Sequence, residues 1–401
     1  MPEARYAWVV VWATFASLAL IFGVAYSFAA FFELFASEFS ARRADVALVF
    51  GLTGLVYFSV GAVGGMLSDR FGPRLVCSLG MVCIAAGLLA TSFAHSMMAV
   101  YWSYGVGIGL GIALVYTPSI GNVQPWFTAR RGLASGLASA GIGLGTVILP
   151  LIAAALISSL EWRTALRLMA GGVLLMGLLA TGMLKPPPVA GAVSGGAHQT
   201  PRGATLGEAL RDRRFWWFYL FTFTAAPTMF IPFAHVSASA RDSGISEASA
   251  VGLVGLIGIG SLIGRFAIGA LADRLGRMQT LTLAQVSMTS TYLLWMVAGA
   301  YPSYAIFALW FGLSYGGIVS LMPAICMDLF GARAVSGIIG SLYTGAALGN
   351  LLGPVAAGAV FDRFGSYVPV MWGSLALSVV AVLAMLAMLR ATKLNPSAQL
   401  H

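Results

Sequence analysis

Residues 65–72 read GMLSDRFG, and residues 269–276 read GALADRLG. The second string follows the first by 204 positions. Three residues of a separate segment recur at the same offset: Gly141, Gly145 and Pro150 correspond to Gly345, Gly349 and Pro354. Two independent segments that agree on one offset indicate an internal duplication. Each string directly follows a long apolar run, so the repeat predicts two homologous sets of helices.

The composition indicates whether these helices lie in water or in a lipid bilayer. Of the 401 residues, 59% are hydrophobic and only 9% are charged, whereas soluble domains carry about 25% charged residues. So few charges cannot cover a globule of this size. Disordered chains are poor in apolar residues, and a membrane β-barrel would show short alternating segments. The long apolar runs therefore predict an all-α membrane protein.

A helix needs about 20 mostly apolar residues to cross the roughly 30 Å of bilayer hydrocarbon. Twelve runs meet this requirement: 8–30, 45–67, 75–93, 99–121, 133–157, 164–184, 214–236, 248–270, 279–299, 303–325, 337–360 and 367–389. The first run is too long for a signal peptide core. Residues 185–213 contain three consecutive prolines and predict a cytoplasmic linker. It separates an N-terminal six-helix half, 1–184, from a C-terminal half, 214–401.

The basic residues predict the orientation. With both termini inside, fifteen of the 22 Lys and Arg residues lie on the cytoplasmic side, six lie outside and Arg265 lies within a span. This distribution satisfies the positive-inside rule and predicts cytoplasmic termini in a cell membrane. Because the charges sit in short loops, no nucleic-acid partner is expected. Three cysteines inside apolar runs, Cys77, Cys83 and Cys326, predict buried thiols and no metal site.

The turn after the second span carries Gly65-x-Leu67-x-Asp69-Arg70-x-Gly72-x-Arg74. With this string the chain resembles the major facilitator superfamily, which implies twelve helices in two six-helix pseudo-repeats and transport by alternating access, not an enzyme. Within that superfamily it resembles the monocarboxylate porters and the related oxalate/formate exchangers. That likeness rests on Tyr26-Ser27-Phe28 with Phe31-Phe32, on Trp126-Phe127-x-x-Arg130-Arg131-Gly132-Leu133-Ala134-x-Gly136, and on Arg265.

The resemblance also implies a conformational latch at the cytoplasmic face. A carboxylate and arginines beside a helix end can form a clamp whose loss shifts the inward/outward equilibrium. We expect this role for six residues: Asp69, Arg70, Arg74, Asp273, Arg274 and Arg277. None of them is expected to contact substrate.

Arg265 is the most informative residue because it lies inside the span 248–270 and not at its rim. A central Arg costs at least about 2.5–3.5 kcal/mol on insertion scales, and no Asp or Glu lies deep in any predicted span. An exchangeable anion is therefore the natural partner, although backbone carbonyls or snorkelling remain an alternative. A guanidinium suits a carboxylate. The exchangers that the chain resembles have a second basic residue on span 11; its absence here favours a monocarboxylate over a dicarboxylate.

Further polar residues at depth are candidates for the same pocket. Tyr116, Tyr315 and Tyr343 can offer hydroxyls to a substrate or simply pack, and Asn350 can bind substrate or a neighbouring helix. His235 follows Pro227 and Pro232, which should bend or interrupt their helix. With an ordinary pKa near 6.5, His235 is a candidate gate or proton site, and an interfacial His is the alternative.

Two positions depart from the animal porters, which carry an Asp one turn before the Arg of the eighth span and a Lys in the first span. Here the first position is Ser261 and the Lys is absent, so their proton relay cannot be transferred. We predict a monomeric, cofactor-free transporter of small monocarboxylates such as lactate or pyruvate, moving with a proton. Proton-independent anion exchange, drug efflux and a non-transporting sensor remain alternatives.

Overall fold

The computed structural model describes the chain except residues 1–4, 124–125, 128–130, 187–202, 332–334 and 394–401. In chain order the helices are α1 (Arg5–Glu38), α2 (Arg43–Phe71), α3 (Pro73–Thr91), α4 (Met97–Val100), the π-helix η1 (Tyr101–Ile108), α5 (Gly109–Val123), α6 (Arg131–Ser159), α7 (Trp162–Gly182), α8 (Leu206–Arg211), α9 (Arg213–Asp242), α10 (Glu247–Leu275), α11 (Arg277–Met296), α12 (Tyr301–Phe330), α13 (Val335–Phe364) and α14 (Val368–Lys393).

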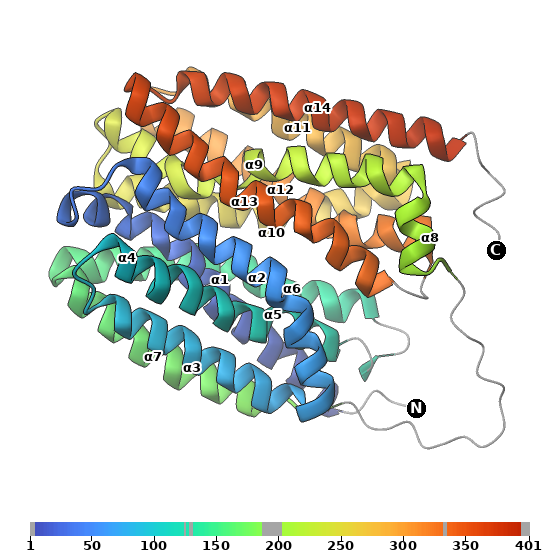
Figure 1. Ribbon diagram of the computed structural model, residues 1–401, viewed down its shortest axis with the longest axis horizontal. Coiled ribbons are helices and arrows are strands. Elements are labelled where there is room, and N and C mark those ends of the chain that lie inside the picture. The colour runs from blue at the N-terminus through green and yellow to red at the C-terminus, as the bar shows by residue number, and fades with distance from the viewer. Residues whose placement is uncertain (1–4, 124–125, 128–130, 187–202, 332–334, 394–401) are drawn as a thin grey trace.

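The helices form two side-by-side bundles (Figure 1). One contains α1–α7, here called the first half, and the other contains α8–α14, the second half. Helix α1 begins and α14 ends at the same end of the molecule, which also holds α8 (Figure 1). We call this the linker end. The opposite end contains the α1–α2 and α13–α14 turns and is called the Arg43 end.

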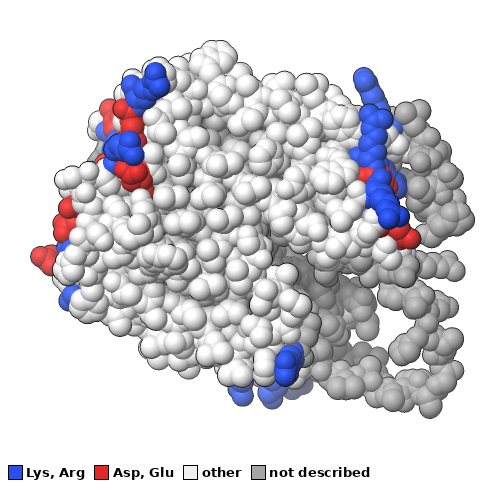
Figure 2. All heavy atoms as spheres, in the orientation of Figure 1, with Lys and Arg blue, Asp and Glu red and all other residues white. Residues whose placement is uncertain are grey.

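The surface matches a membrane environment. On the face seen in Figure 2, Lys, Arg, Asp and Glu gather at the two ends, and an uncharged belt lies between them. Within the described residues, eleven helices are long and apolar enough to cross a bilayer. The predicted span 279–299 is present as α11 but is more polar. Three of its threonines, Thr282, Thr289 and Thr291, donate to backbone carbonyls of the preceding turn, at 2.9, 2.8 and 2.6 Å, so these hydroxyls are satisfied within the helix.

All twelve predicted spans coincide with helices, and the architecture is consistent with twelve crossings. The observed helices are mostly longer than the predicted runs, because a helix continues into the polar region beyond the hydrocarbon. The span 99–121 differs in geometry. It contains the π-helix Tyr101–Ile108 ahead of α5, a feature that hydropathy does not report.

Pro227 and Pro232 were expected to bend or interrupt their helix, and they do not interrupt it, because α9 is one continuous helix from Arg213 to Asp242. Pro232 has no N–H, so the carbonyl of Thr228 loses its helical partner. The hydroxyl of Tyr292, on α11, donates to that carbonyl. A neighbouring helix thus satisfies the acceptor that the proline leaves free.

Glycines of both halves allow backbones to touch. A Cβ at Gly145 of α6 would overlap the carbonyl oxygen of Ala19 on α1, and one at Gly264 of α10 would overlap that of Leu313 on α12. Small residues at helix interfaces permit this close approach. The contact at Gly264, the residue before Arg265, fixes the position of α10 against α12 at this point.

Candidate functional site

A cavity of about 60 Å³ lies between the two halves. A single water needs roughly 10–15 Å³ of such space, so the cavity can hold a small molecule. Both halves line it: Phe22, Tyr57, Phe58, Tyr116 and Ile142 from the first, and Phe221, Thr222, Ala226, Met229, Phe230, Arg265, Tyr315, Val319, Met322, Tyr343 and Ala346 from the second. The described part of its wall is apolar apart from one cation and several hydroxyls.

Arg265 is the cation. It is half-buried on α10 and lines the cavity. No hydrogen bond or ion pair joins its guanidinium to another described residue, and its Nε is buried without a partner. None of the described residues that line the cavity is an Asp or a Glu. An unpaired cation at this depth is costly, and a carboxylate offers the planar pair of acceptors that a guanidinium binds best.

Three predicted tyrosines lie around Arg265. Tyr116, Tyr315 and Tyr343 line the same cavity as Arg265. Tyr116 comes from α5 in the first half, whereas Tyr315 and Tyr343 come from α12 and α13. A ligand held by Arg265 would therefore contact both halves.

Sequence reasoning missed Tyr57, a fourth tyrosine in the cavity wall. The internal repeat could have indicated Tyr57 as a site residue. At the offset of 204, Tyr57 corresponds to Ser261, which lies one helical turn before Arg265. The hydroxyl of Ser261 is itself buried and has no hydrogen-bond partner among the described residues.

His235 and Asn350 do not line this cavity. Asn350, on α13, donates from Nδ2 to the backbone oxygens of Phe50 and Gly51 on α2, at 3.3 Å each. A Cβ at Gly54 would overlap the Asn350 side chain. Asn350 therefore joins the two halves, and it sits on the Arg43 side of the cavity.

His235 is fully buried and both of its ring nitrogens are engaged. Nε2 lies 2.8 Å from the carbonyl oxygen of Pro354, and Nδ1 lies 2.9 Å from the hydroxyl of Tyr367. Because a carbonyl only accepts, Nε2 carries the proton, and in the neutral ring Nδ1 accepts from Tyr367. Tyr367 in turn accepts from Nη1 of Arg43 at 3.0 Å.

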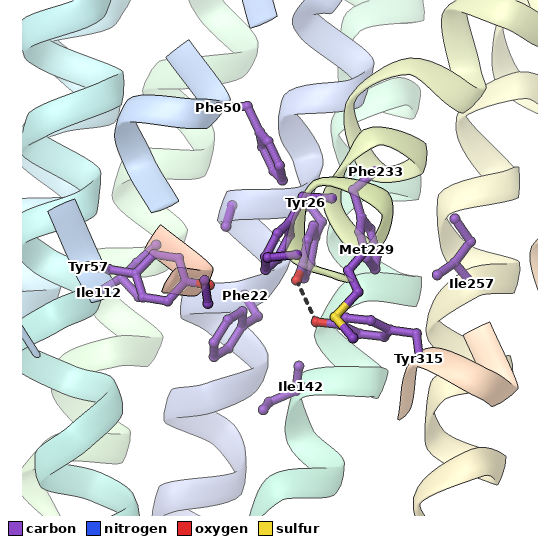
Figure 3. Packing of buried hydrophobic residues seen from close by; sticks show 14 of the residues in the cluster. Phe22, Tyr26, Phe50, Tyr57, Ile112, Ile142, Met229, Phe233, Ile257 and Tyr315 are labelled. Atoms are coloured by element: carbon purple, nitrogen blue, oxygen red, sulfur yellow. Dashed lines mark hydrogen bonds between the residues drawn. The ribbon is translucent and has the colours of Figure 1, made fainter. Parts of the chain in front are cut away.

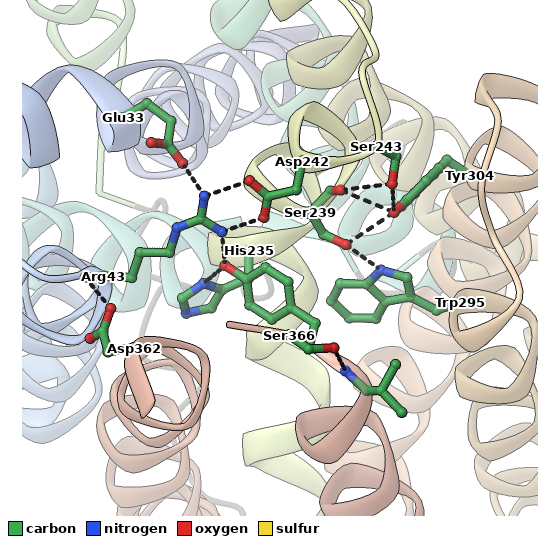
Figure 4. A network of polar contacts seen from close by, with 12 residues as sticks. Glu33, Arg43, His235, Ser239, Asp242, Ser243, Trp295, Tyr304, Asp362 and Ser366 are labelled. Carbon is green, nitrogen blue, oxygen red and sulfur yellow. Dashed lines mark hydrogen bonds and ion pairs between the residues drawn. The ribbon is translucent and has the colours of Figure 1, made fainter. Parts of the chain in front are cut away.

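Arg43 is the centre of a network that closes the Arg43 end (Figure 4). Its guanidinium donates to both oxygens of Asp242, on α9, at 2.6 and 2.8 Å. It forms an ion pair with Glu33 at 3.2 Å and lies 3.9 Å from the ring centre of Phe361. Sequence reasoning counted Arg43 only as a loop charge. Its partners come from distant parts of the chain, so no local pattern announces them.

The predicted latch residues lie at the linker end. Arg74 donates from Nε to the carbonyl oxygen of Gly182, the last residue of α7, at 2.6 Å. Arg277 forms an ion pair with Asp328, at the end of α12, at 2.5 Å. The Arg74 contact lies within the first half, and the Arg277 contact lies within the second half. Arg70, Asp273 and Arg274 are exposed, and the side chain of Asp69 lies outside the described residues.

A helical membrane protein whose two pseudo-symmetric halves enclose a charged cavity has the architecture of a secondary transporter. A family model described as Major Facilitator Superfamily matches residues 13–354 and 260–400. The chain therefore belongs to the Major Facilitator Superfamily.

Two similar proteins indicate to which group of the superfamily the chain is related. Monocarboxylate transporter 3 of Rattus norvegicus is 30% identical over 378 residues, which cover 91% of this chain and 76% of that protein. Monocarboxylate transporter 13 of Bos taurus is 31% identical over 375 residues, covering 91% and 85%. The resemblance to this transporter group is confirmed.

Solved structures support the fold. The chain is similar to a bacterial homologue of the human lysosomal transporter Spinster, in its inward-facing and unoccupied conformation, with a TM-score of 0.76 and 15% identity over 99% of both chains. The inward-facing, occupied form of that homologue also has a TM-score of 0.76, with 14% identity over 100% of this chain and 99% of the other.

Proposed function

We propose that this chain is a secondary active transporter of small monocarboxylates of the lactate and pyruvate type, coupled to protons. It works as a monomer in the cell membrane, with both termini in the cytoplasm. The observation that carries the proposal is the guanidinium of Arg265, which is unpaired among the described residues and lines a cavity between the halves. The relatives named monocarboxylate transporters support the substrate class.

The cavity suits one carboxylate and a small apolar remainder. Arg265 is the single Lys or Arg among the described residues that line it, so a dicarboxylate would leave its second charge without a cation from this part of the chain. Tyr116, Tyr315 and Tyr343 offer hydroxyls to the oxygens of the substrate. The phenylalanine and methionine side chains of the wall suit a short hydrocarbon tail.

The contacts between the halves support alternating access. Hydrogen bonds and ion pairs join the halves at Arg43 and Asp242, at Asn350, and at Tyr26 and Tyr315. All of these lie at the Arg43 end or at mid-depth. With cytoplasmic termini, this is a state closed toward the outside. Asp69, Arg70 and Arg74, with Asp273, Arg274 and Arg277, then act as the latch of the opposite state.

His235 is the candidate for proton coupling. Its ring is linked through Tyr367 to Arg43, the residue that joins the halves at the Arg43 end. If Nδ1 gains a proton it must donate to Tyr367, whose own proton then needs a new acceptor, because Arg43 can only donate. Protonation of His235 thus requires rearrangement of the closed network, which couples the proton to opening of that end.

One observation favours a second function, proton-independent exchange of organic anions. Both ring nitrogens of His235 have partners and His235 does not line the cavity, and no carboxyl side chain lines it among the residues that the structure describes. In that mechanism the empty transporter cannot reorient, because Arg265 would be left without an anion. Net uptake would then need a counter-anion inside.

The test is uptake of labelled L-lactate into proteoliposomes, with and without an inward proton gradient, and with and without internal lactate. We expect a proton gradient to stimulate net uptake, Arg265→Gln to reduce uptake at least about tenfold through loss of the charge-assisted hydrogen bonds, and His235→Gln to abolish the stimulation. Arg363→Gln, which alters an exposed arginine at the Arg43 end, is the matched control and should keep wild-type uptake.

Each proposal has its own contradicting result. Uptake that depends on internal lactate and ignores the proton gradient would establish exchange in place of proton coupling. Uptake that survives unchanged in Arg265→Gln would remove the carboxylate site, and absence of monocarboxylate uptake in the wild type would overturn the substrate class.

A further inference from the structure

Tyr26 and Tyr315 form a hydrogen bond that joins the two halves beside the cavity (Figure 3). Tyr26 belongs to α1 in the first half and Tyr315 to α12 in the second. Their hydroxyl oxygens are 3.3 Å apart. Tyr315 lines the cavity with Arg265, whereas Tyr26 does not. Tyr26 therefore reaches the cavity through Tyr315.

The ring of Tyr26 is held firmly by aromatic neighbours. It stacks on Phe233 of α9, with ring centres 4.3 Å apart and an angle of 26° between the planes. It also stacks on Phe22, one turn earlier in α1, with ring centres 6.1 Å apart. Only 3% of Tyr26 is exposed. Contacts from both halves thus fix the direction in which its hydroxyl points.

The two hydroxyls carry two protons, and the hydrogen bond between them uses only one. Each phenol can donate once and accept as well. If Tyr26 donates to Tyr315, the proton of Tyr315 is free to point into the cavity. A carboxylate only accepts hydrogen bonds, so an anion held by Arg265 selects this orientation. A chain from Tyr26 through Tyr315 to the anion then forms, and such chains strengthen each of their bonds.

We infer that Tyr26 is a positioning residue for the substrate carboxylate and that it transmits occupancy of the cavity to the interface between the halves. This inference rests on the proposed function. A carboxylate that accepts from Tyr315 strengthens the bond between α1 and α12, so a loaded cavity holds the two halves together more firmly than an empty one.

A double-mutant cycle tests this role, because a residue that acts through another has no effect once that other is removed. L-lactate affinity and uptake are measured for the wild type, Tyr26→Phe, Tyr315→Phe and the double variant. We expect Tyr26→Phe to weaken affinity about 2- to 10-fold, as for loss of one hydrogen bond. In the Tyr315→Phe background the same change should have no further effect.

A second readout separates positioning from plain packing. Tyr104→Phe is the matched control, since Tyr104 is also buried in the first half and donates to the backbone oxygen of Val24 at 2.9 Å. It lies outside the cavity wall and should leave affinity unchanged. Lactate should raise the thermal unfolding temperature of the wild type by more than that of Tyr26→Phe, because the reinforced bond between the halves is missing in the variant.

The outcomes distinguish this inference from the function on which it rests. An equal effect of Tyr26→Phe in both backgrounds, or wild-type affinity in Tyr26→Phe, would overturn the inference while Arg265-dependent uptake still supported the transporter. Absence of Arg265-dependent monocarboxylate uptake in all variants would overturn both.

Discussion

The carboxylate of Asp362, near the end of α13, accepts hydrogen bonds from the backbone amides of Arg43 and Ala44, at the start of α2, at 3.0 Å each. A residue of the second half thus caps a helix of the first. The first amides of a helix have no partner within it, and a negative charge beside them is favourable. A Cβ at Gly358, one turn before Asp362, would overlap the backbone of Ala44, so this contact needs a glycine.

The first prediction concerns this cap. Asp362→Ala removes the charge and both acceptor oxygens, and it should shift the equilibrium toward opening of the Arg43 end by about 2- to 30-fold, the range for loss of a helix cap. Spin labels at Ser37 and Ala248, both exposed at that end on different halves, measure the distance by pulsed electron resonance in a cysteine-free background.

A longer distance population should grow in this variant. Glu161→Ala, which removes an exposed carboxylate at the Arg43 end that makes no side-chain cap bond to α7, is the control and should retain the wild-type distribution. An unchanged distribution in Asp362→Ala would mean that the cap does not contribute to closure.

The second prediction concerns Tyr367, which lies in the turn between α13 and α14, before the observed span Val368–Thr392. Burial raises the pKa of its hydroxyl above the ordinary value, and the nearby Arg43 only partly opposes this. An unfolded tyrosine ionises near pH 10. Above about that pH the folded chain keeps the proton of Tyr367 while the unfolded chain loses it, so stability falls as pH rises. At lower pH both states are protonated, and this group adds no pH dependence.

Thermal unfolding between pH 8 and 11 provides the measurement. The alkaline fall in unfolding temperature should be less steep in Tyr367→Phe than in the wild type. Identical slopes in the two proteins would contradict the assignment of this pKa shift to Tyr367.

The third prediction concerns the hydroxyl of Tyr292 and the Thr228 carbonyl that Pro232 leaves free. Tyr292→Phe should cost about 1–3 kcal/mol of stability, the penalty for a buried acceptor without a partner. In a Pro232→Ala background the cost should be smaller, because the restored amide at position 232 can donate to Thr228. Chemical unfolding of the four proteins in detergent measures this coupling, and equal costs in both backgrounds would refute it.

The fourth prediction concerns the contact between α1 and α6. Gly145→Ala should destabilise the chain by about 1–3 kcal/mol or more, because the new methyl would overlap the carbonyl of Ala19. Gly171→Ala on α7 is the control, since nothing lies within 4 Å of its Cβ position. That change should be neutral or stabilising, given the helix propensity of alanine. A stable Gly145→Ala variant would show that α1 can move away freely.

Much of the site could be predicted because the bilayer limits which residue types a membrane span can contain. A charge in hydrocarbon needs a reason, so Arg265 stood out without knowledge of its neighbours. The tyrosines were weaker predictions, since a tyrosine in a span packs as readily as it binds. That Tyr116, Tyr315 and Tyr343 surround Arg265 depends on how α5, α10, α12 and α13 are arranged, which periodicity does not report.

Arg43 and His235 show where prediction stopped. Arg43 precedes a predicted span and was counted as one of six outer charges. Its bonds to Asp242 and Tyr367 join residues 199 and 324 positions apart in the chain. His235 was placed at the outer end of its span, yet whether it faced water or protein depended on Tyr367 and Pro354, from α13 and the turn that follows it.

The sequence by itself determined the membrane-spanning helices, the duplication and the lone deep cation, because each follows from hydropathy, from an internal offset or from the cost of burying a charge. Only the tertiary structure decided which side chains surround Arg265, which carboxylates bind Arg43, and that Tyr26 reaches the cavity through Tyr315. These are contacts between helices far apart in the chain, and they depend on the close approach that residues such as Gly145 and Gly264 allow.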